Sequence, residues 1–113
     1  MVSKIEYNQF LDVDIRVGTI IKAELNHLLK KPSIVLIIDF GNEIGIKKSS
    51  AQITVNYQSN DLINRQVVAV VNFKPKQIGN LLSEVLVLGF PDDNKETILI
   101  APDKKIKNGA RLF

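Results

Sequence analysis

The 113-residue sequence predicts an all-β protein, a small five-stranded barrel with one short helix before its fourth strand. Two observations predict this class. Apolar segments with the two-residue period of β-strands recur along the chain and are separated by turn residues. The segments with helical character are short, and one of them lies between the third and fourth apolar segments. A chain of this length is expected to form a single domain over residues 1–113.

The N-terminal part is expected to form a short helix followed by a long strand. Ser3 and Glu6 have the spacing of a capping box, which predicts a helix over residues 4–11 with Ser3 as its N-cap. Alternate residues from Ile15 to Leu25 then share one face, which predicts a strand. Gly18 within this strand predicts a bulge or tight bend of the kind that closes a barrel.

Later elements follow from the same signals. Strands are expected over residues 33–40, 43–53, 66–73, 84–90 and 97–101, and a short helix over residues 59–64. A helix between the third and fourth strands is the pattern of an OB-fold barrel. The segments 66–73 and 84–90 are apolar on both faces, so their outer faces need a cover. A second subunit is the preferred cover and predicts a homodimer; the N-terminal helix alone is the alternative.

Composition and motif spacing argue against an enzyme. The chain has no cysteine, which excludes disulfides and thiolate metal sites, and it shows no spacing typical of metal ligands. His27 is the only histidine and lies in a predicted loop without an implied partner. Ser49 and Ser50 point to opposite faces of a predicted strand and have no base nearby in sequence. We therefore predict a non-enzymatic protein without a metal or cofactor.

No segment of the sequence predicts insertion into a membrane. Residues 1–10 lack the apolar region of a signal peptide. The longest aliphatic runs, residues 34–38 and 67–71, are too short to span a bilayer and suit buried strands. A cytoplasmic location is therefore expected.

Charge permits a polyanionic partner without requiring one. The net charge is +3 and the isoelectric point is about 9.2. In an OB-fold, ligands bind on strands two and three and on the loops after strands one and four. The lysines expected on these elements are Lys30, Lys31, Lys47, Lys48, Lys74 and Lys76. They predict an RNA interface, although ordinary solvent-exposed loops would explain the same lysines.

Two motifs resemble those of the tRNA-binding domain family. Residues 72–75, Asn-Phe-Lys-Pro, resemble its asparagine-leucine-lysine-proline signature, and residues 14–18 resemble its first-strand motif. The resemblance implies an OB-fold and structure-specific binding of tRNA in trans. It adds Asn72 and Ser83 to the lysines as expected RNA-binding residues. The family usually has a basic residue where Gln77 stands, and this departure weakens the tRNA interpretation.

Longer segments are similar to the CsaA branch of that family, namely residues 40–47, 49–54 and 83–89. The branch comprises cytoplasmic OB-fold homodimers described as export-related chaperones. The resemblance therefore implies a chaperone that binds unfolded preproteins and works with the secretion machinery, with tRNA binding as the alternative. The residues expected to edge an apolar peptide groove are Phe40, Ile46, Ser49 and Phe73. Phe40 and Phe73 would alternatively pack in the core.

Overall fold

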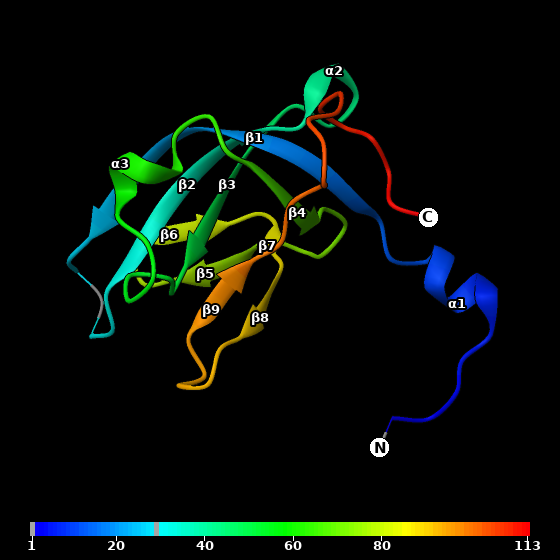
Figure 1. Cartoon of the computed structure of the whole chain (residues 1–113), viewed down its shortest axis with the longest axis horizontal. Helices are drawn as coiled ribbons and strands as arrows, with labels where there is room; N and C mark the ends of the chain where they lie inside the picture. The colour runs from blue at the N-terminus through cyan, green and yellow to red at the C-terminus, as the bar shows by residue number, and fades with distance from the viewer. Residues whose placement is uncertain (1, 29) are drawn as a thin grey trace.

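The computed structural model, which describes residues 2–28 and 30–113, confirms the predicted fold class (Figure 1). Its centre is a curled antiparallel sheet of five strands that forms half of a barrel. The strands, in sheet order, are β3 (Ile46–Ala51), β2 (Ser33–Asp39), β1 (Ile15–Asn26), β4 (Gln66–Val70) and β7 (Leu86–Val87).

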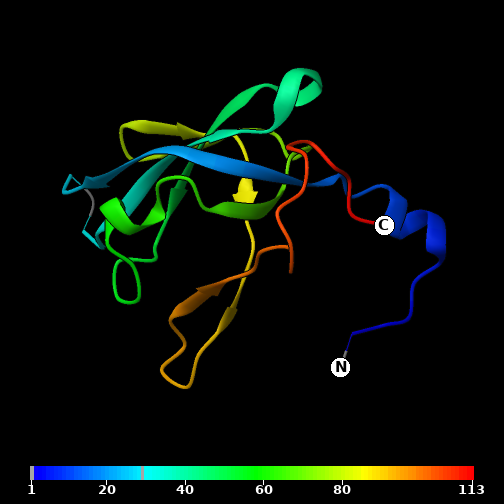
Figure 2. The same ribbon diagram turned by 45° about the horizontal axis from the view of Figure 1, so that its top comes forward.

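Short helices and two hairpins complete the fold. The helices are α1 (Tyr7–Leu11), α2 (Gly41–Ile44) and α3 (Ser59–Leu62). The hairpins pair β5 (Lys76–Ile78) with β6 (Leu81–Ser83), and β8 (Gly89–Pro91) with β9 (Thr97–Leu99). Hairpin β8–β9 projects from the barrel, as the turned view shows (Figure 2). Helix α1 lies apart from the barrel, and none of its residues is buried (Figure 1).

The core fills the curl of the sheet. The side chains of Ile20, Leu36, Ile38 and Phe40 are fully buried there. Burial of one such side chain stabilises the fold by roughly 1.5–3 kcal/mol. Leu62 of α3 is also fully buried in the same cluster. The helix that the sequence predicts before the fourth strand therefore contributes directly to the core.

The first strand has its predicted position, but a bulge changes its alternation. The pairing of β1 with β2 shifts between Ile20 and Lys22, beyond the predicted bulge at Gly18. An extra residue in one strand moves the side chains that follow to the other face. Before the bulge the core side holds Gly18 and Ile20, and after it Ala23. The prediction that alternate residues share one face from Ile15 through to Leu25 therefore fails at the bulge, where Ile21 is 44% exposed.

Gly18 is required by close packing. A Cβ atom at this position would lie 2.7 Å from both Ile38 Cγ2 and Phe40 Cδ1. Real Cβ atoms do not approach other heavy atoms so closely, so the neighbouring side chains would have to move. The absence of a side chain at Gly18 therefore lets the fully buried Phe40 lie directly against β1.

The predicted start of the N-terminal helix and the predicted start of the third strand are both wrong. Helix α1 begins at Tyr7 because its cap is formed by Glu6, whose N–H donates to Gln9 Oε1 at 2.7 Å. Ser3 therefore lies outside the helix. Residues predicted to begin the third strand instead form α2, and β3 starts only at Ile46.

The region after β4 differs most from prediction. The fourth strand ends at Val70 rather than at residue 73, and the segment expected as a loop contains the hairpin β5–β6. The predicted strand over residues 84–90 is divided into β7 and β8. These differences matter because hairpin β5–β6 and β7 build the cavity described next.

Candidate binding site

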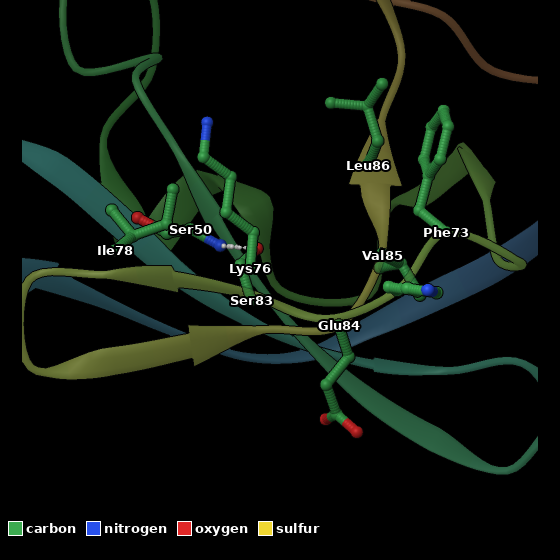
Figure 3. Close-up of a pocket in the computed structure, with 9 residues that line it drawn as sticks. Ser50, Phe73, Lys76, Ile78, Ser83, Glu84, Val85 and Leu86 are labelled. Carbon is green, nitrogen blue, oxygen red and sulfur yellow. Dashed lines mark hydrogen bonds between the residues drawn. The ribbon is translucent and has the colours of Figure 1, made fainter.

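A cavity of about 570 Å³ lies where hairpin β5–β6 meets β7 and the turn after β4 (Figure 3). We call this cavity the hairpin pocket. Its lining residues are Ser50, Phe73, Lys74, Lys76, Ile78, Ser83, Glu84, Val85 and Leu86. The pocket thus brings together one residue predicted to bind peptide and three predicted to bind RNA.

Apolar side chains form two sides of the hairpin pocket. Phe73 is 56% exposed and Leu86 is 51% exposed. Figure 3 shows both side chains on one side of the pocket and Ile78 on the other. Apolar side chains that gather in an exposed concavity are typical of sites that a ligand or partner covers.

Hydrogen bonds to β3 hold the floor of the pocket in place. The Ser50 N–H donates to Ser83 Oγ at 3.0 Å, the bond drawn in Figure 3. The Ser49 hydroxyl donates to the Val85 carbonyl at 3.1 Å. The Ser83 hydroxyl, predicted to bind RNA, therefore already serves as an acceptor within the fold.

The rim of the pocket is cationic. Lys74 and Lys76 are both exposed at its edge. The Glu84 carboxylate points away from the pocket in Figure 3, and its Oε1 accepts the Lys48 N–H at 3.0 Å. The Glu84 N–H donates in turn to the Lys48 carbonyl at 2.8 Å. Glu84 therefore acts mainly as a link to β3 and leaves both rim lysines available to an acidic ligand group.

Two residues predicted to edge a peptide groove lie in the interior instead. Phe40 has no exposed surface and packs in the core beside Gly18. Ser49 is 2% exposed, and its hydroxyl is bonded to Val85. Neither side chain is accessible to a peptide, which corrects that expectation. Ile46 is 59% exposed, but it lies at the start of β3 and does not line the hairpin pocket.

The Asn72 side chain bonds the main chain of the N-terminal segment, and we call this pair of hydrogen bonds the clasp. Its Oδ1 accepts the Asp14 N–H at 2.9 Å, and its Nδ2 donates to the Asp12 carbonyl at 2.8 Å. The amide group expected to contact RNA is therefore used to hold the N-terminal segment. Because Asn72 directly precedes Phe73, this clasp also fixes the turn that carries one wall of the hairpin pocket.

The other predicted RNA-binding lysines do not line the hairpin pocket. Lys31 lines a second cavity, between β3 and hairpin β8–β9. Lys30 is exposed in the connection between β1 and β2. Lys47 and Lys48 lie on β3 and are half-buried. The predicted basic surface is therefore divided among separate parts of the molecule.

A charged cluster away from the pocket joins the two ends of the chain. Arg16 Nε lies 2.6 Å from Asp14 Oδ1, and Arg16 Nη1 lies 3.3 Å from Glu43 Oε1. Arg111 Nε lies 3.4 Å from the same Asp14 oxygen. The hydrogen bond to Asp14 raises the pKa of Arg16, outweighing the opposing effect of burial. This cluster secures the terminal segments.

Within residues 2–28 and 30–113, no cluster of histidine, aspartate and glutamate side chains has the form of a metal site. No helix formed by those residues is long and apolar enough to cross a membrane.

The chain matches the family model of the tRNA binding domain over residues 15–111. It is 32% identical over 111 residues to the methionine–tRNA ligase of Thermococcus onnurineus, a match that covers 98% of this chain. It is 34% identical over 112 residues to that of Methanothrix thermoacetophila, with 96% covered. The chain spans only 15% of the length of these two ligases.

Solved structures of similar length match the whole fold. The chaperone CsaA of Bacillus anthracis is 44% identical with a TM-score of 0.91, and the match covers 98% of this chain and 100% of that one. The CsaA chaperone protein of Picrophilus torridus is 46% identical with a TM-score of 0.90, covering 97% and 100%. The MetRS related protein of Pyrococcus horikoshii is 27% identical with a TM-score of 0.87, covering 99% and 100%. The chain therefore belongs to the tRNA binding domain family, and within that family it is of the CsaA type.

Proposed function

We propose that this protein is a non-enzymatic chaperone that captures unfolded polypeptide segments in the hairpin pocket. The observation that carries the proposal is the pairing of exposed Phe73 and Leu86 in one concave site of about 570 Å³. A cavity of this size accommodates one or two apolar side chains of a client. The likeness to CsaA chaperones supports a peptide as the ligand. On the same basis, its clients are cytoplasmic preproteins on their way to the secretion machinery.

Binding of tRNA is the second candidate function. The observation that favours it is the position of Lys74 and Lys76 on the rim of the same pocket, in a chain of the tRNA binding domain family. Lysines at such a rim would contact phosphates without reading sequence. RNA and peptide would then compete, because both would cover the mouth of the hairpin pocket.

The salt dependence of binding separates the two functions. The purified protein is titrated against a fluorescent unfolded preprotein peptide and against labelled total tRNA, from low salt to about 0.15 M. Apolar capture changes little over this range, whereas binding through phosphate contacts weakens steeply. The proposal predicts peptide binding that persists at the higher salt concentration.

The contrary result would be saturable tRNA binding at about 0.15 M salt without measurable peptide binding. Loss of that tRNA binding in the double variant Lys74→Ala, Lys76→Ala would assign the pocket to RNA. The matched control is Lys104→Ala with Lys105→Ala, which removes the same charge from exposed residues outside the hairpin pocket.

We further propose that the protein acts as a homodimer. The apolar side chains of Ile5, Tyr7 and Leu11 are 62%, 70% and 43% exposed on a segment that lies apart from the barrel. Exposed apolar side chains on a separate arm are typical of a surface that a second subunit covers. The likeness to the CsaA branch supports the same assembly.

A further inference from the structure

Polar groups of the hairpin pocket lie on the same face of hairpin β5–β6 as one of its apolar side chains. Lys76 and Ile78 are two residues apart on β5, and alternate residues of a strand share a face. Ser83 of β6 stands directly opposite Lys76 in the antiparallel pair. All three residues line the pocket. An ammonium group, a hydroxyl group and an apolar side chain therefore meet on one side of the site, as Figure 3 shows.

The Ser83 hydroxyl is held in place and has a hydrogen to donate. Its oxygen accepts the Ser50 N–H at 3.0 Å, and this bond fixes the side chain against β3. Within residues 2–28 and 30–113, no hydrogen bond uses the hydrogen of this hydroxyl. A serine hydroxyl carries one donor beside its acceptor sites. Ser83 can therefore donate to a ligand oxygen while its bond to β3 stays intact.

The two lysines of the pocket are free of internal ion pairs. The ion pairs among the described residues are formed by other lysines and arginines, not by Lys74 or Lys76. The carboxylate of Glu84 also belongs to a residue that lines the pocket, but it points away and accepts the Lys48 N–H. The mouth of the pocket therefore presents two positive charges beside apolar walls.

Neighbouring residues of one peptide can cover both the apolar and the charged part of this surface. Residues two apart on a strand are separated by about 7 Å along the chain, and Lys76 and Ile78 have this spacing. An extended peptide with an apolar side chain beside Ile78 brings the side chains one or two residues away to the rim. A carboxylate there gains the Lys76 ammonium group and the Ser83 hydroxyl as partners. A lysine or arginine there is repelled instead.

We propose that the hairpin pocket selects client segments in which an apolar residue is flanked by aspartate or glutamate. The apolar side chain enters between Phe73, Leu86 and Ile78, and the carboxylate binds Lys76 and the Ser83 hydroxyl. This inference rests on the proposed chaperone function and names the class of segment that is captured. The apolar walls favour a peptide over RNA, whose phosphates would engage only the lysines of the rim.

The proposal has a consequence for the part of a preprotein that is held. A secretory signal peptide begins with positively charged residues before its apolar region. The pocket lysines repel such residues. Acidic residues close to apolar ones are common in the sequences of globular proteins. We therefore expect the pocket to bind segments of the mature protein in preference to the start of the signal peptide.

Three short fluorescent peptides test the selection on the unaltered protein. Each has one central leucine in a serine-rich sequence, flanked on both sides by glutamate, by glutamine or by lysine. Glutamine has the shape of glutamate without its charge. Fluorescence anisotropy measures the affinities at about 0.1 M salt, where charges within about 10 Å still interact. We expect the glutamate peptide to bind about three- to fivefold more tightly than the glutamine peptide, and the lysine peptide to bind most weakly.

Variants of the protein test the residues themselves. Lys74→Gln with Lys76→Gln is expected to abolish the preference for the glutamate peptide over the glutamine peptide. Lys104→Gln with Lys105→Gln removes the same charge from exposed residues outside the pocket and should keep the preference. Ser83→Ala should reduce the preference about twofold. Because the readout is a ratio of two affinities, a general effect of a variant on folding cancels.

Equal affinity of the three peptides would overturn the acidic selection and leave apolar capture in the hairpin pocket standing. An equal loss of preference in the two double-lysine variants would also overturn it, since net charge would then explain the selection. Failure of all three peptides to bind would overturn the chaperone proposal and this inference together. A single-stranded RNA that binds in that case, and is lost in the variant of Lys74 and Lys76, would assign the two lysines to phosphates.

Discussion

At the scale of single residues, the Asn-Phe-Lys-Pro motif at residues 72–75 has two different roles. Asn72, Phe73 and Lys74 are adjacent in the chain, yet only Phe73 and Lys74 line the hairpin pocket. The Asn72 side chain instead binds the main chain at Asp12 and Asp14. A short motif thus combines a clasp for the N-terminal segment with two walls of a binding site.

Removal of the clasp is predicted to lower stability. Asn72→Ala leaves the Asp14 N–H and the Asp12 carbonyl without these partners, which should reduce the free energy of unfolding by about 1–2 kcal/mol. Urea denaturation measures the change. Asn60→Ala, an exposed asparagine of α3, is the control and is expected to stay within about 0.5 kcal/mol of the unaltered protein. Equal midpoints for the Asn72 variant and the unaltered protein would contradict the clasp.

Residue types alone could not reveal this division of roles. Phe73 was open to two interpretations, core or groove, and only its 56% exposure selects the groove. Phe40 was open to the same two, and burial against Gly18 selects the core. The local sequence around Asn72 does not indicate that its side chain binds the main chain at Asp12 and Asp14. Such contacts depend on pairing between segments far apart in sequence.

At the scale of elements, the projecting hairpin β8–β9 is organised around one carboxylate. Asp92 Oδ1 accepts the main-chain N–H groups of Asn94 and Glu96, at 2.8 and 2.9 Å. Its Oδ2 accepts the Asn56 side chain at 3.0 Å. The hydrogen bond from Asn56, followed by the bond from Glu96, lowers the pKa of Asp92 below its ordinary 3.8.

The order of this hairpin is therefore predicted to be insensitive to pH near neutrality. A lowered pKa means that the ionised carboxylate favours the folded turn, a contribution present above pH 3.8 and lost as the pH falls through the lowered value. An NMR titration of the Asp92 carboxyl group checks this. Asn56→Ala is expected to move the pKa up toward 3.8, and Asn94→Ala to leave it unchanged because the main-chain donor remains. Titration of Asp92 above 3.8 in the unaltered protein would contradict the assignment.

Sequence patterns predict the long strands of this fold but not its shortest ones. Long apolar segments such as β1 and β2 are predicted within a residue or two, because an extended run of buried apolar residues is easily recognised. The hairpin β5–β6 was missed because three-residue strands are too short to show a period. Leu86 was expected in a strand covered on both faces, but β7 is an edge strand of the sheet and Leu86 is 51% exposed. The hairpin pocket depends on these two elements and so could not be predicted as a cavity.

At the scale of the whole molecule, the N-terminal arm lies apart from the barrel. We define the arm as residues 2–13, which precede β1 and carry α1. Among the described residues, the side-chain hydrogen bonds that join the arm to the rest of the chain are those from Asn72 to the Asp12 carbonyl at 2.8 Å and from Arg111 to the Leu11 carbonyl at 2.7 Å. An arm with exposed apolar residues and few such contacts is typical of a segment that completes a partner.

Deletion of residues 2–11 is predicted to yield a monomer. The shortened chain keeps the core residues of the barrel, so its far-ultraviolet circular dichroism should retain the β-sheet signal. Light scattering after size-exclusion chromatography measures the mass. A second variant, Ile5→Ser with Tyr7→Ser, keeps the chain length and removes two exposed apolar side chains of the arm. It should also weaken the dimer. A full-length chain that is already monomeric would contradict the dimer.

The central claim is that a client peptide is captured through the apolar wall of the hairpin pocket. Its most direct test compares the affinity of a fluorescent unfolded preprotein peptide for Phe73→Ala and for Phe90→Ala, at about 0.15 M salt. Both variants remove an exposed phenylalanine ring, 56% and 66% accessible, but only Phe73 lines the pocket. We predict binding about five- to tenfold weaker for Phe73→Ala, the loss expected for roughly 1 kcal/mol of apolar burial, and unchanged affinity for Phe90→Ala. Unchanged affinity for Phe73→Ala, or an equal loss for both variants, would contradict the claim.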